Sequence, residues 1–144
     1  MGMYTQIVFN ADLEVHNEAD RNAIKLLFSG VWPPGTVSRE LLPEHEFFDC
    51  PRWDFLFNCD SYYNPGISVR GYEDGPRDII RVSGVGDFKN YDDEILLFLD
   101  WVLPFASAYD EDAFLGYFKY EECQNPTLIF STGACSLEDR LNET

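Results

Sequence analysis

Residues 4–15, YTQIVFNADLEV, alternate between inward and outward side chains in a way that fits one kind of local structure. Successive residues of a β-strand point to opposite faces, so a period of two indicates a strand with one buried and one exposed face. The inward set is Thr5, Ile7, Phe9, Ala11, Leu13 and Val15. The outward set is Gln6, Asn10, Asp12 and Glu14, with Val8 as the apolar exception. Such a strand belongs to an antiparallel sheet whose second face is in contact with water.

Two other segments carry apolar residues at helical spacing. The first follows Asn17, whose side chain can cap a helix, and ends at Gly30. Its predicted buried stripe is Ala23, Ile24, Leu27 and Phe28. The second follows Asn90, and its predicted buried stripe is Ile95, Phe98, Leu99, Val102 and Leu103. Pro104 lacks the amide hydrogen that a helix interior needs, so this helix is predicted to end there.

The remaining strands are predicted from shorter patterns. A second alternating stretch indicates a strand at 53–60, with one face made of Trp53, Phe55, Phe57 and Cys59. Residues 67–72 and 79–85 predict a hairpin, because Asp74-Gly75 between them favours a tight reversal. FLGYFKYEE and PTLIFST, joined at Gln124-Asn125-Pro126, predict a closing hairpin.

The elements follow one another as β-α-β-β-β-α-β-β. With mostly hairpin connections, this order predicts the α+β class, with one antiparallel sheet of about five or six strands and two helices on one face. The predicted domain is single and spans 3–134, and residues 135–144 are predicted to form a polar tail.

Charge is the strongest compositional signal. The chain has 26 acidic and 10 basic residues, which gives a net charge of −16. Direct binding to nucleic acid is not expected, because such binding depends on lysine and arginine neutralising phosphates. No apolar run approaches the roughly 20 residues that span a bilayer, and the start of the chain shows no secretion signal, so we expect a cytoplasmic protein.

No pattern points to catalysis, a cofactor or a metal. The four cysteines form no C-x-x-C pair and are expected to be free thiols. Asp54, Asp60 and His45 could in principle serve a small hydrolase, but no nucleophile or phosphate-loop signature accompanies them. We therefore expect a protein that is not an enzyme.

The segment 87–122 concentrates acid beside aromatic residues. It contains ten acidic residues and two basic ones, Lys89 and Lys119. A surface of this kind can imitate a phosphate array, and tyrosines at its edge would supply the anchors that binding hot spots favour. The predicted contact residues are Asp87, Tyr91, Asp92, Asp93, Glu94, Tyr109, Asp110, Glu111, Asp112, Tyr120, Glu121 and Glu122. A solvated acidic face without a partner is the simpler alternative.

The main concentration of basic residues suggests a different function. Arg70, Arg77 and Arg81 lie around one predicted hairpin, close to Tyr72. Arginine beside aromatic rings can bind an anionic small ligand such as a nucleotide. Pairing of these arginines with neighbouring aspartates and glutamates is the alternative.

Four phrases of the sequence resemble small uncharacterised proteins of phages and mobile elements: MYTQIVFNADL (3–13), RWDFLFNCDSYY (52–63), NYDDEILLFLDWVLPF (90–105) and GYFKYEE (116–122). The resemblance implies a setting in which small acidic proteins inhibit host defence, including CRISPR and restriction nucleases. The partner, a basic host protein that itself binds nucleic acid, is predicted from the net charge of −16 and its density between Asp87 and Glu122.

Overall fold

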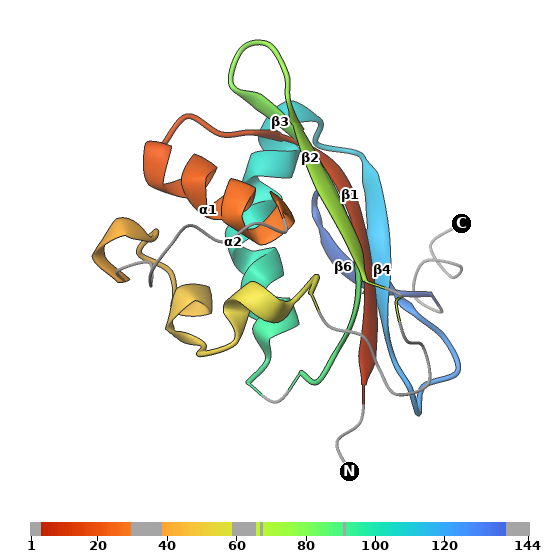
Figure 1. Cartoon of the computed structure of the whole chain (residues 1–144). Helices are drawn as coiled ribbons and strands as arrows, with labels where there is room; N and C mark the ends of the chain where they lie inside the picture. Colours follow the sequence, from red (N-terminus) through yellow and green to blue (C-terminus); the bar gives the residue numbers. More distant parts are fainter. Residues whose placement is uncertain (1–3, 30–38, 59–65, 67, 91, 138–144) are drawn as a thin grey trace.

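The computed structural model describes residues 4–29, 39–58, 66, 68–90 and 92–137 (Figure 1). The helices are α1 (Glu18–Ser29) and α2 (Glu94–Tyr109), and the 3₁₀ turns are η1 (Arg39–Leu41), η2 (Glu46–Asp49) and η3 (Trp53–Phe55). The strands are β1 (Thr5–Glu14), β2 (Val69–Asp74), β3 (Ile79–Phe88), β4 (Phe114–Tyr120), β5 (Thr127–Phe130) and β6 (Gly133–Ser136). One antiparallel sheet of six strands with two helices confirms the predicted α+β class.

β1 is an interior strand in the order β2-β3-β1-β4-β5-β6. It pairs with β3 over its full length and with β4 from Thr5 to Phe9. The predicted alternation of β1 is confirmed, because its inward residues are all buried. Figure 1 shows α1 and α2 on one side of the sheet, and rings from both helices contact Phe9 on its buried face.

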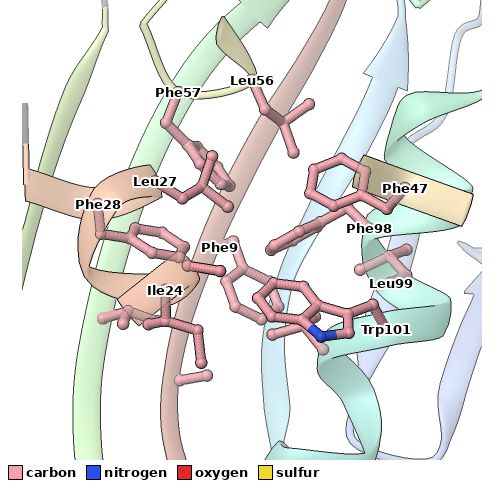
Figure 2. Packing of buried hydrophobic residues seen from close by; sticks show 14 of the residues in the cluster. Phe9, Ile24, Leu27, Phe28, Phe47, Leu56, Phe57, Phe98, Leu99 and Trp101 are labelled. Atoms are coloured by element: carbon pink, nitrogen blue, oxygen red, sulfur yellow. The ribbon is translucent and has the colours of Figure 1, made fainter. Parts of the chain in front are cut away.

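A cluster of aromatic rings fills the space between the sheet and the helices (Figure 2). The ring of Phe9 lies 5.2 Å from that of Phe98 in α2 and 6.4 Å from that of Phe28 in α1, measured between centroids. Phe57 stacks on Phe28 at 4.8 Å. Burying one such side chain stabilises the fold by about 1.5–3 kcal/mol. The predicted stripes of both helices are buried, apart from Leu103, which is half-buried.

The segment 53–57 does not form the strand that its alternation predicts. It forms η3 and a following turn, with Trp53, Leu56 and Phe57 buried and Phe55 41% exposed. Burial at intervals of three and four residues is the pattern of helical structure. Cys59, the last residue of the predicted face, lies outside the described residues.

Two glycines of β3 explain why this segment lies on the sheet and not within it. A Cβ atom on Gly84 would lie 2.5 Å from the ring of Phe57, and one on Gly86 would lie 2.3 Å from the carbonyl oxygen of Leu56. Because glycine has no Cβ atom, residues 56–57 can lie directly against the backbone of β3.

Alanine at Gly86 should therefore force the backbone of the segment away from β3. We expect Gly86→Ala to lower the free energy of unfolding by about 1–3 kcal/mol, the usual cost of overpacking. Gly71→Ala in the edge strand β2 is the control, because its new Cβ atom would have no neighbour within 4 Å. Its free energy of unfolding should be unchanged or rise by up to about 1 kcal/mol. Urea unfolding measures both, and equal losses would contradict the explanation.

α2 continues through Pro104 to Tyr109, so the predicted end of this helix is wrong. The hydrogen bond that proline removes is the one to the carbonyl of Asp100. Pro104 and Asp100 are both exposed, so water can satisfy that carbonyl. The predicted cap at Asn90 is wrong, because the helix begins at Glu94 and its N-cap residue is Asp93. The side-chain oxygen of Asn90 nevertheless accepts a hydrogen bond from the amide of Ile95 at 3.1 Å.

The two predicted hairpins are confirmed as β2–β3 and β4–β5. β6 then pairs with β5, so the sheet continues to Ser136, beyond the predicted start of a polar tail at 135. Residues 138–144 lie outside the described part of the chain. Neither helix in the described ranges has both the length and the apolar character needed to cross a membrane.

Candidate functional site

The structure divides the predicted contact residues between the two ends of α2. The helix-end cluster consists of Tyr109, Asp110, Glu111 and Asp112. The helix-start cluster consists of Asp92, Asp93, Tyr120, Glu121 and Glu122. α2 has 16 residues and therefore rises about 24 Å between its ends. Tyr91 lies outside the described residues.

Strand pairing brings the members of the helix-start cluster to one end of the sheet. Thr5, the first residue of β1, pairs with both Phe88 and Tyr120. The amide of Glu121 also donates a hydrogen bond to the carbonyl of Tyr4 at 3.0 Å. The acids that follow β3 and those that follow β4 therefore lie at the same end of the sheet. Partial desolvation, and then the charges of Glu122 and Glu121, raise the pKa of Tyr120.

Two of the predicted contact residues are buried and are not available to a partner. Asp87 is 5% exposed and Glu94 is fully buried. The carboxylate of Glu94 accepts a hydrogen bond from Arg52 at 3.2 Å and from the amide of Asp92 at 2.8 Å. Arg52 also donates to the carbonyl of Lys89 at 2.6 Å. Glu94 thus holds the start of α2 against the loop that precedes it.

Removal of this carboxylate should destabilise the fold. We expect Glu94→Ala to lower the free energy of unfolding by about 2 kcal/mol, because it removes the acceptor of one Arg52 hydrogen bond and of the Asp92 amide. Glu111→Ala removes an exposed carboxylate of the same chemistry and should change it by less than about 0.5 kcal/mol. Chemical unfolding of the two variants tests this, and equal stabilities would show that Glu94 has no structural role.

The exposed acids of the two clusters form no ion pair among the described residues, which is also true of Glu18, Glu44, Glu46 and Glu73 elsewhere. Several acids elsewhere form ion pairs with arginine or lysine: Asp12–Arg81 at 2.8 Å, Asp49–Arg39 at 2.9 Å, Asp74–Arg21 at 3.2 Å, Asp74–Lys25 at 3.3 Å and Asp78–Arg21 at 3.9 Å. Asp78 also lies 2.9 Å from His16, and Asp100 lies 2.8 Å from His45. Within the described ranges, no ion pair involves Asp92, Asp93, Asp110, Glu111, Asp112, Glu121 or Glu122. The negative charge of the two clusters is therefore not neutralised by an ion pair within the described ranges.

A groove of about 560 Å³ opens beside the helix-end cluster. β1 pairs with β4 only as far as Phe9 and Gly116, although β1 itself continues to Glu14. A Cβ atom on Gly116 would lie 1.9 Å from a carbonyl oxygen of β1, so this last close approach requires glycine. Tyr109, which is 50% exposed, and Phe114, which is 60% exposed, line the groove where the strands separate.

The arginines considered for an anionic ligand do not converge. Arg70 lies opposite Gly84, on the face of the sheet that carries the helices. Arg81 lies opposite Glu73 on the other face and is paired with an aspartate of β1. Arg77 lies in the turn between the strands, with a φ angle of 57°. The predicted ligand set is therefore spread over two faces and a turn. Its fourth member, Tyr72, has the ammonium group of Lys25 at 6.0 Å from its ring.

The described residues considered for catalysis are held by local hydrogen bonds or burial. The Nδ1 atom of His45 accepts the amide hydrogen of Phe47, and its Nε2 atom lies 2.8 Å from the carboxylate of Asp100. Burial raises the pKa of Asp54, and the charge of Arg70 partly opposes this shift. Asp60 lies outside the described residues. Among the residues that the structure describes, no three His, Cys, Asp or Glu side chains form a group that could hold a metal ion.

Comparison with protein-family models finds no matching family, and comparisons with curated proteins and with solved structures find no match. The resemblance to small phage proteins therefore stays a prediction.

Proposed function

We propose that this chain is a non-catalytic acidic binding protein that docks on a positively charged, nucleic-acid-binding host protein and inhibits it. The observation that carries the proposal is the grouping of unpaired acids at the two ends of α2. Arg21, Lys25, Arg39 and Arg81 neutralise carboxylates elsewhere, whereas the exposed acids of the helix-end and helix-start clusters have no ion pair among the described residues. Uncompensated charge of this kind accelerates the approach of a basic partner.

The separation of the clusters suits a partner that binds nucleic acid. The clusters are separated by the length of α2, about 24 Å, and successive phosphates of one DNA strand are about 3.4 Å apart along the helix axis. The two clusters would thus span about seven phosphates of one strand. The exposed tyrosines 109 and 120 would add the aromatic contacts that binding interfaces favour.

The setting follows from the resemblance to small phage proteins. We propose that the protein acts in the cytoplasm, and that its target is a host defence nuclease of the CRISPR or restriction type. A bound acidic protein would compete with nucleic acid for the basic groove of such an enzyme, so inhibition would require no chemistry by this chain.

A competition assay tests the proposal. Purified CRISPR and restriction nucleases are loaded with a fluorescent DNA duplex, and displacement by this protein is followed by fluorescence anisotropy. We expect displacement from at least one nuclease. The helix-end triple variant Asp110→Asn, Glu111→Gln, Asp112→Asn should associate about tenfold more slowly at low salt and show a weaker dependence on salt.

A matched control separates the clusters from net charge. Glu14→Gln, Asp74→Asn and Asp78→Asn together remove the same formal charge, but these acids lie beside Arg21, Lys25 and His16. This triple variant should associate nearly as fast as the wild type. Equal slowing in the two variants would show that only total charge matters, and the absence of displacement from every nuclease would contradict the proposed function.

A further inference from the structure

Val8, the apolar exception on the outward side of β1, belongs to a row that crosses the whole sheet. Residues directly opposite each other in paired strands lie on the same face, so the register traces the row from strand to strand. Val8 lies opposite Val85 and Tyr117. Val85 in turn lies opposite Val69, Tyr117 opposite Leu128, and Leu128 opposite Cys135. Each of the six strands contributes one residue with little polar character to this row.

The row lies on the face of the sheet opposite the helices. In β1 this face carries Gln6, Val8 and Asn10, whereas the helices cover the face that carries Ile7 and Phe9. Adjacent strands are about 4.8 Å apart, so a row across six strands is about 24 Å long. None of its members is fully buried, and Val69 is 65% exposed.

A second pair of rings widens the row beside the groove. Phe114 lies opposite Phe130, and their ring centroids are 5.4 Å apart. Phe130 is two residues beyond Leu128 in β5, so both rings lie on the same face as the row. We name these residues together the sheet-face patch: Val8, Val69, Val85, Phe114, Tyr117, Leu128, Phe130 and Cys135.

The charges around the sheet-face patch indicate the chemistry of its occupant. Phe114 follows Asp112 by two residues, so the aromatic end of the patch adjoins the helix-end cluster and its unpaired carboxylates. On the same face, Arg81 is already paired with Asp12, and Lys119 lies opposite Gln6. Glu14 and Glu73 add negative charge to this face. A second copy of this chain would bring another charge of −16 to the same place, which disfavours it. The surroundings suit a partner with lysine or arginine around an apolar centre.

We infer that the sheet-face patch is the apolar centre of the docking surface, and that it binds a basic protein segment whose aromatic or aliphatic side chains alternate with lysine or arginine. The inference rests on the proposed function and identifies the surface that performs it. An apolar centre with a charged rim is the usual arrangement of a protein interface, in which a few large side chains supply most of the affinity. Val69 and Phe114 are the well-exposed members of the patch, and contiguous exposed apolar residues can mark such sites.

Two peptides of equal charge test the inference. One is a lysine-rich peptide with aromatic residues at alternate positions, and the other has serine in place of each aromatic residue. Binding is measured by isothermal titration calorimetry at two salt concentrations. We expect the wild type to bind the aromatic peptide about tenfold more tightly than the serine peptide.

Two double variants test whether the preference for the aromatic peptide depends on the sheet-face patch. Phe114→Thr with Leu128→Thr keeps residues that favour strands, and should reduce the preference for the aromatic peptide to less than about twofold. The control Leu41→Thr with Leu96→Gln removes two exposed apolar side chains from η1 and α2 and should retain the preference. Circular dichroism and urea unfolding establish that both double variants are folded.

The outcomes separate this inference from the proposed function. Equal binding of the two peptides by the wild type, or the same loss of preference in both double variants, would overturn the inference and leave the proposed function standing. Binding of neither peptide would overturn the inference, whereas the proposed function is decided by the displacement assay. Sedimentation tests for a second copy as the occupant. If the wild type forms dimers and the double variant Phe114→Thr with Leu128→Thr is monomeric, a second copy is the occupant and the inference is overturned.

Discussion

The burial of one face of β1 against the two helices is the constraint on which the rest of the structure depends. Phe9 contacts rings from α1 and α2, and the same strand aligns β3 on one side and β4 on the other. A shift of one residue in β1 would bring its polar side chains into the core, so its register is strongly specified. That register in turn fixes which residues of the other strands share the uncovered face.

Sequence reasoning succeeded where the signal was local. The alternation of β1, the cap at Asn17 and both hairpins follow from neighbouring residues, and the structure confirms them. It failed at 53–57, where a period of two coincided with a turn that packs on β3 because Gly84 and Gly86 leave room for it. A contact between segments so far apart in the chain cannot be obtained from the local pattern.

The candidate site was predicted in part. The concentration of acid between 87 and 122 was visible in the sequence, but its division between the ends of α2, and the burial of Asp87 and Glu94, required the fold. The sheet-face patch was not predicted, because it depends on five successive strand pairings. Val8 on the polar side of β1 was the one sequence signal that pointed to it. Charge would govern how fast a partner arrives, and the patch would govern how long it stays.

Nuclear magnetic resonance of methyl groups tests this account most directly. The protein is labelled on valine and leucine methyls and titrated with any nuclease that gives displacement in the competition assay. We predict that the resonances of Val8, Val85 and Leu128 shift or broaden first, whereas those of Leu41 and Leu96 on η1 and α2 change little. Changes confined to Leu41 and Leu96, with the methyls of the uncovered sheet face unaffected, would contradict it.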